Sequence, residues 1–374
     1  MNATTGTQLS RLPLIDPHRA DAGTYRPVSA EARAELPSAP RGLDVEISGA
    51  GRQYDLDAWL AFTHGTSLLV VDRGQVTYEW YADGLGPETL FLGASMSKSV
   101  LAHLVGRAVQ AGVLRLCDDV SAHVPDLVAT GYGCVRVQDL LTMTTGVDWY
   151  EDYRDPNSLA SHLVAAFSVP PGDSRAVLRR IGRRHARGQQ YAYCTADSQV
   201  LDWVRERATG LEYADDLARL WRDLGCTSDA AVGTDAHGVA LGGGGVAATT
   251  RDWARVGMLA IDGHGQNARL LDSAWLDAAA RPAYSFLAPG RLPSSITTHV
   301  GFGYHWWPMD TDGRRVAADG SRGQFIYVDR AEHVVVVKTS RWPYDDWLAD
   351  RQYRDLSYLG LAEIAAAAVR ARTA

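Results

Sequence analysis

The order of strand-like and helix-like segments predicts an α/β (α+β) fold, in which a discontinuous α/β domain holds an all-helical insert domain. Strand patterns lie toward both ends of the chain, at 67–80 and 304–340, whereas 114–240 carries mainly helical spacing. Because strands must pair to satisfy their backbone groups, we expect the two strand-rich parts to form one discontinuous domain around the helices.

We divide the chain of 374 residues into three parts, since this length is enough for one large or two medium domains. An irregular N-terminal arm is expected over 1–40, where prolines and polar residues are frequent. The α/β domain comprises 41–113 and 246–374, and the all-helical domain comprises 114–245.

A hairpin opens the α/β domain and leads to the helix that carries the principal motif. Strand patterns at Ser67–Val71 and Gln75–Trp80 flank Asp72-Arg73-Gly74, which is a turn signal. Apolar residues at helical spacing begin after Ser95 and continue to Ala111-Gly112, where the glycine ends the helix.

The remaining elements are predicted from the same two periodicities. Helices are expected at 54–62, 137–143, 158–167, 174–180, 198–208, 213–224, 250–261, 273–280 and 353–371, and strands at 304–309, 324–329 and 333–340. The run Gly242–Gly245 has neither phosphate-loop spacing nor a strand signal beside it. It therefore predicts a flexible turn where the chain crosses between domains.

Composition argues against several classes of partner. The formal net charge of −7 without a long basic run disfavours nucleic acid, and the longest apolar runs are too short to cross a membrane. The segment Met1–Arg11 lacks the apolar core of a signal peptide, which favours a cytoplasmic protein. The four cysteines form no CxxC or Cys/His pairing and the histidines form no HExxH, so we expect free thiols and neither a metal nor a cofactor. A monomer and a homodimer both remain open.

Ser95 and Lys98 form the motif that indicates chemistry. Their three-residue spacing at a helix start places both side chains on one face. A neutral lysine amine can take the proton of a serine hydroxyl, which is otherwise a poor nucleophile. The alternative is a capping serine followed by a first-turn lysine, which the positive end of the helix disfavours.

The use of lysine supports the catalytic interpretation. The chain has only two lysines, Lys98 and Lys338, beside many arginines. Because arginine stays protonated and cannot act as a base, a lysine at position 98 supplies a property that arginine lacks.

Two later stretches can complete a serine site. Tyr193 precedes an expected helix, and a phenol beside a lysine can move protons between nucleophile and leaving group; the alternative is a packed aromatic residue. Asp319–Gln324 leads into a strand, and its backbone N–H groups can stabilise an oxyanion; the alternative is a plain turn. We reject Lys338-Thr339-Ser340 as a Lys-Thr-Gly box, because it ends the last strand without a following glycine.

The ordered set of these segments resembles the serine β-lactamase/penicillin-binding superfamily, in its class C-like esterase branch. Within this branch the chain is most similar to the 6-aminohexanoate-dimer hydrolase group and its carboxylesterase relatives, over about residues 60–345. The resemblance implies a serine β-lactamase-like fold, with an antiparallel sheet flanked by helices and an all-helical insert domain. The matching segments are Ser95–Ser99, Asp148–Tyr153, Tyr193–Asp197, Trp306–Trp307, Gly323–Gln324 and Ser340–Pro343.

The resemblance also implies a role for each matching residue. Ser95 is the acylated nucleophile, Lys98 and Tyr193 are its general-base pair, and the backbone N–H groups of Ser95 and Ser321 form the oxyanion hole. Tyr153 closes over the substrate on a loop and donates to the leaving nitrogen of amides. Further substrate contacts are expected from Trp149, Trp307, Gly243 and Trp342.

Two departures from the family pattern bear on the substrate. Thr195 stands where the wider superfamily often has asparagine, which argues against direct β-lactam recognition. No acidic residue falls near Val164, where amide-active relatives hold the amino group of the substrate.

The expected function is a serine hydrolase of carboxylic esters, with small linear amides left open, that works through an acyl-Ser95 intermediate. The alternatives are an acyltransferase using the same acyl-enzyme, a β-lactamase or D-alanyl-D-alanine peptidase, and a non-catalytic sensor or scaffold. The lack of an export signal disfavours the second alternative, whose substrate lies outside the membrane. The intact set of Ser95, Lys98 and Tyr193 disfavours the third.

Overall fold

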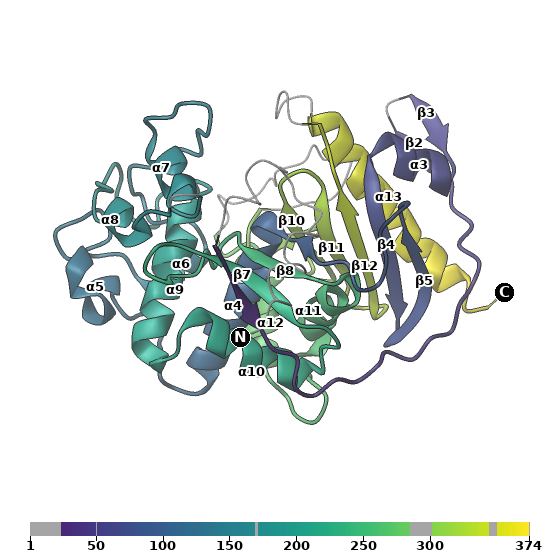
Figure 1. The fold of residues 1–374 in the computed structure, drawn as a ribbon, viewed down its shortest axis with the longest axis horizontal. Helices are drawn as coiled ribbons and strands as arrows, with labels where there is room; N and C mark the ends of the chain where they lie inside the picture. The colour runs from purple at the N-terminus through teal and green to yellow at the C-terminus, as the bar shows by residue number, and fades with distance from the viewer. Residues whose placement is uncertain (1–23, 50, 169–170, 285–300, 344–349, 374) are drawn as a thin grey trace, which may run out of the picture.

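The largest sheet is antiparallel throughout and joins the two ends of the chain. The computed structural model describes residues 24–49, 51–168, 171–284, 301–343 and 350–373. The strand order in this sheet is β5-β4-β12-β11-β10-β9, so the early hairpin β4–β5 pairs with the late strand β12 (Figure 1). The strands are β4 (Gly65–Asp72), β5 (Gln75–Tyr81), β9 (Trp307–Pro308), β10 (Arg315–Gly320), β11 (Gln324–Asp329) and β12 (Val334–Ser340). The predicted antiparallel sheet built from both ends of the chain is therefore confirmed.

Side chains of this sheet alternate between two separate hydrophobic clusters. On β4, Leu69 and Val71 belong to one cluster, whereas Leu68 and Val70 belong to the other. Both faces are therefore buried, which explains why the strands carry continuous apolar runs instead of alternating polar and apolar residues.

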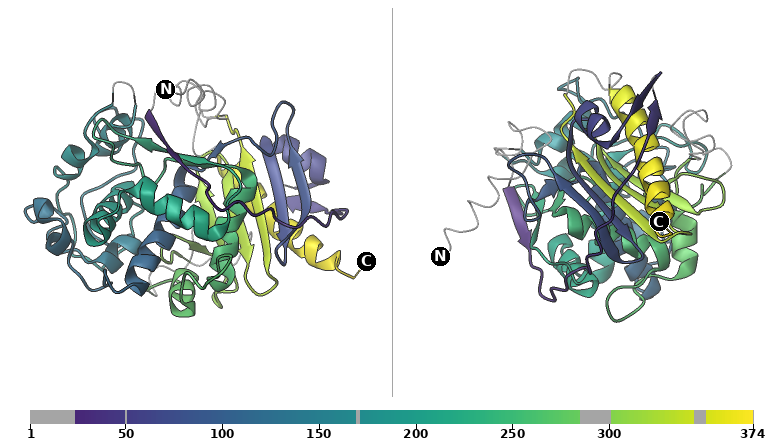
Figure 2. Two further views of the ribbon diagram at one scale, coloured as in Figure 1. Left: turned by 60° about the horizontal axis from the view of Figure 1, so that its bottom comes forward. Right: turned by 90° about the vertical axis from the view of Figure 1, so that its right-hand side faces the viewer.

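Helices cover both faces of the sheet. One face packs against α11 and the other against α13, and Figure 2 shows the yellow α13 lying along its face of the sheet. The helices that contact the large sheet are α3 (Leu56–Phe62), α4 (Ser97–Gln110), α11 (Thr250–Asp262) and α13 (Asp350–Arg370). The sequence pattern predicted all four of them.

A helical region stands on the side of the molecule away from α13 (Figure 1). Its central helix is α9, which is buried over most of its length and packs against α4 and α6. The helices of this part and its surroundings are α5 (Val120–His123), α6 (Val137–Leu141), α7 (Leu159–Ala165), α8 (Ser174–Leu178), α9 (Thr195–Thr209), α10 (Tyr213–Leu224) and α12 (Ser273–Ala279). The packing of α9 on α4 joins the helical region to the helix that follows Ser95.

A four-stranded sheet, with the order β1-β7-β8-β6, adds strands that the sequence did not predict (Figure 2). A further two-stranded sheet pairs β2 with β3. The strands of these sheets are β1 (Thr24–Val28), β2 (Ile47–Gly49), β3 (Arg52–Tyr54), β6 (Phe91–Leu92), β7 (Ala230–Thr234) and β8 (Val246–Ala248).

This sheet changes three of the sequence-based expectations. The arm expected to be irregular contains β1, while residues 1–23 lie outside the described part of the chain. The segment expected to be all-helical contains β7, and the run Gly242–Gly245 leads directly into β8. Strands β7 and β8 are short and rich in alanine, so their pairing partners decide their structure more than their own β-propensity does. The domain boundaries at 113/114 and 245/246 stay a prediction.

The end of the large sheet also differs from the expectation. The strand expected at 304–309 shortens to β9, and β10 was not predicted. The sequence of β10, Arg-Val-Ala-Ala-Asp-Gly, has a single β-branched residue, whereas β11 and β12 contain more. Pairing with β11 along its whole length forms β10 instead.

The four cysteines all lie among the described residues, and none of them forms a disulfide. Cys117 and Cys134 are exposed free thiols, and Cys194 and Cys226 are buried free thiols.

In the part of the chain that the structure describes, no helix has the length and apolar character needed to cross a membrane.

Gly93 marks a close approach that a stability measurement can test. A Cβ added to Gly93 would lie 2.4 Å from a ring carbon of Trp253, whose indole N–H donates to the carbonyl of Phe91 at 3.0 Å. Gly93→Ala therefore must displace a buried indole, and we expect the free energy of unfolding in urea to fall by about 1–3 kcal/mol.

Gly42→Ala is the matched control for this prediction. A Cβ at Gly42 meets no atom within 4 Å, so this variant should stay within about 0.5 kcal/mol of the unchanged protein. Equal unfolding midpoints for the two variants would contradict the close contact between Gly93 and Trp253.

Candidate active site

The turn that carries Ser95 is strained and anchored on both sides. Ser95 lies in the short 3₁₀ helix η1 (Ala94–Met96), directly before α4, and Ala94 has a left-handed φ of 46°. Such a φ is unfavourable for a residue with a side chain and persists only where neighbours enforce it. Here the Gly93 N–H donates to the Val246 carbonyl at 2.8 Å, and the Ser97 hydroxyl accepts from the Val246 N–H at 3.1 Å. Strand β8 thus holds the turn in place.

Lys98 is buried, with 3% of its surface exposed, and lies among three oxygen atoms. Its Nζ is 3.2 Å from Ser95 Oγ, 3.2 Å from Thr195 Oγ1 and 2.8 Å from the Gly243 carbonyl oxygen. These partners come from η1, from the first residue of α9 and from the loop between β7 and β8. The structure therefore brings the predicted Ser95–Lys98 pair together and adds two partners that the sequence did not predict.

Tyr193 meets Lys98 through the face of its ring, whose centroid is 5.2 Å from Nζ. On its other side the Tyr193 ring stacks on Trp307, with centroids 6.0 Å apart and an interplanar angle of 14°. Trp307 in turn packs edge-on against Phe302 at 4.7 Å, in a cluster that includes Met143. The aromatic cluster thus supports Tyr193 beside the lysine, and its role in proton transfer stays a prediction.

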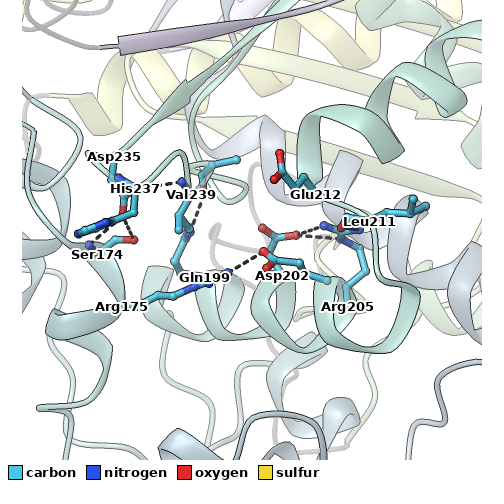
Figure 3. Close-up of polar contacts among 12 residues, drawn as sticks. Ser174, Arg175, Gln199, Asp202, Arg205, Leu211, Glu212, Asp235, His237 and Val239 are labelled. Atoms are coloured by element: carbon cyan, nitrogen blue, oxygen red, sulfur yellow. Dashed lines mark hydrogen bonds and ion pairs between the residues drawn. The ribbon is translucent and has the colours of Figure 1, made fainter.

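The loop that supplies the Gly243 carbonyl is ordered by a buried aspartate, as Figure 3 shows. Asp235 accepts hydrogen bonds from the Ser174 N–H and hydroxyl at 3.0 and 2.6 Å. It also accepts from the N–H groups of His237 and Val239, at 2.9 and 3.0 Å. One carboxylate therefore connects the start of this loop to α8.

The glycines of this loop let its backbone lie directly on α9. A Cβ on Gly243 would be 2.8 Å from Ser198 Cβ, and one on Gly242 would be 2.9 Å from the Tyr213 ring. The Gln199 side-chain amide also donates to the Ala240 carbonyl. The expected flexible turn is thus a closely packed loop. The Gly243 carbonyl, predicted in the substrate pocket, is here a hydrogen-bond acceptor for Lys98.

The same helix contains a buried ion pair that stabilises its packing on α10. Arg205 Nε donates to Asp202 at 2.8 Å and Arg205 Nη1 donates to Asp216 of α10 at 2.9 Å (Figure 3). Arg205 and Asp202 are almost fully buried, so loss of either partner would leave an uncompensated charge inside the protein.

His305 forms the layer beneath Lys98 and joins three helices. Its Nδ1 lies 3.0 Å from the Leu141 carbonyl, and its Nε2 lies 3.0 Å from Ser198 Oγ. Its own carbonyl accepts from the Ser99 hydroxyl at 2.7 Å. Burial first, and the positive charge of Lys98 second, lower the pKa of His305 to about 3, so it is neutral at physiological pH. Since Nδ1 faces a carbonyl it donates, and Nε2 therefore accepts from Ser198.

The turn after β10 carries Ser321 and lies against the Ser95 turn. A Cβ on Gly320 would lie 2.1 Å from the Gly93 carbonyl oxygen, so only glycine permits this approach. Arg322 has a left-handed φ of 63°, and the Gln324 amide donates to the Arg322 carbonyl at 3.2 Å. The packing of β10 on η1 supports the predicted oxyanion role of the Ser321 N–H, which stays a prediction.

Trp342 and Lys338 lie beneath this turn. The Trp342 indole N–H donates to the Thr63 carbonyl at 3.0 Å, and a Cβ on Gly323 would be 2.5 Å from the indole. Trp342 is thus packed in a hydrophobic cluster and supports the turn, and its predicted contact with substrate stays a prediction. Lys338 is fully buried on β12, where its Nζ contacts Ser340 Oγ, and burial lowers its pKa to about 7. Lys338 therefore lies on a strand that β11 separates from β10, and this position is consistent with the rejection of Lys338-Thr339-Ser340 as a Lys-Thr-Gly box.

Glu151 lies in the segment Asp148–Tyr153, which carries part of the family resemblance, but the resemblance gave it no role. Its carboxylate accepts from Trp149 Nε1 at 3.0 Å, from the Tyr153 hydroxyl and from the Thr195 N–H. The Tyr153 hydroxyl also lies 3.5 Å from Thr195 Oγ1. Burial, and then the charge of Glu151, raise the pKa of Tyr153 well above its usual value. The phenol predicted to serve the leaving group therefore donates to Glu151 in this structure, and Trp149 orients the same carboxylate.

Backbone strain is concentrated around these residues. Four of the seven described non-glycine residues with left-handed φ lie next to the nucleophile, beside the aromatic cluster, beneath Lys98 and in the turn after β10; they are Ala94, Met143, His305 and Arg322, while His64, Arg73 and His333 lie in other turns. Each such residue costs of order 1–3 kcal/mol, so their grouping indicates a functional site. Among the described residues, His, Cys, Asp and Glu side chains form no group of three or more that could hold a metal ion.

Comparison with known proteins agrees with the predicted resemblance. Residues 61–359 match the protein-family model described as Beta-lactamase. The 6-aminohexanoate-dimer hydrolase of Paenarthrobacter ureafaciens is 30% identical over 336 residues, which cover 87% of this chain and 85% of that protein.

Solved structures share the fold. A proposed 6-aminohexanoate-dimer hydrolase from Bacillus anthracis has a TM-score of 0.78 at 21% identity, over 96% of this chain and 98% of that chain. A class C β-lactamase in complex with cefoxitin has a TM-score of 0.55 at 18% identity, over 82% and 96% of the two chains. EstCE1, a hydrolase with promiscuous acyltransferase activity, has a TM-score of 0.59 at 17% identity, over 79% and 93%.

These similarities confirm the predicted serine β-lactamase-like fold, with helices and antiparallel sheets like those of the class C enzymes. The family model covers more than half of the chain, and the relative from Paenarthrobacter covers most of it. The protein belongs to the β-lactamase family of serine hydrolases and is a homologue of 6-aminohexanoate-dimer hydrolase.

Proposed function

We propose that the protein hydrolyses carboxylic esters through an acyl-Ser95 intermediate, with Lys98 and Tyr193 as the general-base pair. The observation that carries the proposal is the buried Lys98 amine, 3.2 Å from the Ser95 hydroxyl oxygen. A hydroxyl next to a base excluded from bulk water is suited to nucleophilic attack. The strained turn beneath Ser95 supports the same assignment.

The chemistry proceeds in two balanced steps. Ser95 Oγ bonds to the ester carbonyl carbon while its proton passes to the Lys98 amine. The N–H groups of Ser95 and Ser321 donate to the oxyanion that forms. The carbon–oxygen bond to the leaving alcohol then breaks, and the alkoxide takes the proton of Lys98 either directly or through Tyr193, which donates its own proton and receives that of Lys98. Water repeats the sequence on the acyl-enzyme, which releases the carboxylic acid and restores Ser95.

Two features of the structure favour esters over amides as substrates. An alkoxide leaves with little assistance, whereas an amine leaves well only if its nitrogen receives a proton or a hydrogen bond. The Tyr153 hydroxyl, the candidate donor, is engaged by Glu151 in this structure. The apolar Val164 lies in α7, near the position expected to hold a substrate amino group. We therefore propose esters as the main substrate class and small linear amides, the class named for the Paenarthrobacter relative, as a secondary one.

A fluorophosphonate probe tests the nucleophile. We expect one equivalent of label on the peptide that contains Ser95, and a burst of product with a short p-nitrophenyl ester, because the acyl-enzyme forms before it is hydrolysed. Intact-mass and peptide-mass measurements locate the label. Ser95→Ala is the control and should show neither label nor burst. A label on another serine in the unchanged protein would end the proposal.

Lys98→Arg tests the base. Arginine keeps the positive charge but cannot give up its proton, so we expect kcat/KM for the ester to fall by at least about 10²–10⁴-fold. Circular dichroism and the unfolding midpoint serve as controls, because the larger side chain enters a buried site. A folded Lys98→Arg protein with near-normal turnover would refute the role of Lys98.

Tyr153→Phe separates ester from amide chemistry. The variant keeps the ring and removes the hydroxyl that would assist a leaving nitrogen. We expect ester kcat/KM within a few-fold of the unchanged protein, and amide kcat/KM lower by about ten-fold, or roughly 1.4 kcal/mol. Matched ester and amide substrates with the same acyl group provide the comparison. Equal losses on both would show that the hydroxyl does not serve the leaving group.

A further inference from the structure

We infer that Glu151 sets the direction of a hydrogen-bond chain that ends at Lys98 and thereby points the lone pair of the neutral amine at Ser95. The chain runs from Glu151 through Tyr153 and Thr195 to Lys98. This inference rests on the proposed function, because it concerns how the base is oriented toward its nucleophile.

The hydrogen count at Lys98 defines the problem. A neutral amine has two N–H bonds and one lone pair, and Nζ faces three oxygens, of Ser95, Thr195 and Gly243. The Gly243 carbonyl can only accept, so it takes one N–H. If Thr195 accepts the second N–H, the lone pair remains for the proton of Ser95. If Thr195 donates instead, the lone pair of this neutral, proton-accepting form of Lys98 is occupied and Ser95 has no base.

The charge of Glu151 decides between these two arrangements. An ionised carboxylate only accepts, so the Tyr153 hydroxyl donates to it. The raised pKa of Tyr153 keeps this proton on the phenol. With its single proton used, Tyr153 can only accept from Thr195, whose hydroxyl lies 3.5 Å away. Thr195 donates its proton to this acceptor, so it has none left for Lys98 and accepts the N–H of the amine.

Two further donors hold Glu151 in the required orientation. Its Oε1 accepts from Trp149 Nε1 at 3.0 Å and from the backbone N–H of Thr195, which leaves Oε2 for the Tyr153 hydroxyl. The carboxylate also lies at the amino end of α9, where the helix dipole favours a negative charge. Glu151 is thus a positioning residue, which acts on Lys98 through Tyr153 and Thr195.

Thr195 explains why the position of the Tyr153 proton matters. A hydroxyl can both donate and accept, so Thr195 accepts from Lys98 only if no neighbouring hydroxyl donates to it. Glu151 holds the Tyr153 proton and thereby prevents that donation.

Glu151→Gln reverses the direction of the hydrogen-bond chain without a change in the shape of the side chain at position 151. Trp149 and the Thr195 N–H both need an acceptor, so they hold the amide oxygen, and the amide nitrogen faces Tyr153. Tyr153 then accepts from Gln, donates to Thr195, and Thr195 donates to the lone pair of Lys98. We expect the rate constant for labelling of Ser95 by the fluorophosphonate to fall about ten-fold or more, and ester kcat to fall while KM is retained.

A second substitution should restore the activity. In the double variant Glu151→Gln with Tyr153→Phe, the reversed donor is absent and Thr195 can accept from Lys98 again. We expect this protein to be labelled faster than Glu151→Gln and at about the rate of Tyr153→Phe alone. A purely structural role of Glu151 predicts instead that the second substitution adds to the loss.

Asp152→Asn is the control for removal of a nearby negative charge. Asp152 is exposed and accepts from the backbone N–H groups of Arg154 and Asp155, so its variant should be labelled within two-fold of the unchanged rate. Unfolding midpoints of all the variants confirm that each protein is folded at the assay temperature.

The labelling experiment separates failure of the inference from failure of the proposed function. A normal labelling rate for Glu151→Gln, or a double variant no faster than Glu151→Gln, overturns the inference and leaves Ser95 as the nucleophile. Absence of label on Ser95 in the unchanged protein overturns the proposed function and the inference with it.

Discussion

The buried Lys98 amine is the constraint on which the arrangement of the site depends. Taking an amine out of water costs several kcal/mol unless hydrogen bonds replace the lost solvent. The replacing partners, Ser95, Thr195 and Gly243, come from three segments that are far apart in the chain. The strained turn at Ala94, the glycine loop on α9 and the packing of α9 against α4 all serve to bring these partners to one point.

An uncharged histidine lies beneath Lys98 and its three hydrogen-bond partners. His305 lies under the site with both ring nitrogens hydrogen-bonded, and its pKa of about 3 keeps the imidazole uncharged beside Lys98. The nearest carboxylate in the chain of contacts, Glu151, acts on the lysine through two hydroxyl groups. The site therefore combines a desolvated base with a negative charge that orients it from a distance, which is the preorganisation that electrostatic catalysis requires.

Parts of the structure that depend on short-range spacing were predictable from the sequence. The hairpin around Arg73 and Gly74, the helix after Ser95 and the pair Ser95–Lys98 all depend on neighbours within a few residues. The strands β7 and β10 were not predictable, because pairing across the fold forms them and their alanine-rich sequences carry little signal of their own. The Gly243 carbonyl was missed as a partner of Lys98, since every residue has a carbonyl and only the tertiary structure selects one. Glu151 stood in a segment that the resemblance had marked, but its role depends on the backbone N–H of Thr195, which is distant in the chain, as well as on its neighbours Trp149 and Tyr153.

The most direct test of the account is a crystal structure of the protein after reaction with the fluorophosphonate. The account predicts phosphorus bonded to Ser95 Oγ, with the phosphoryl oxygen about 2.7–3.1 Å from the backbone nitrogens of Ser95 and Ser321. It also predicts that Lys98 keeps its contacts with Thr195 and the Gly243 carbonyl. A phosphoryl oxygen turned away from the backbone of Ser321, or an adduct on any other residue, would contradict it.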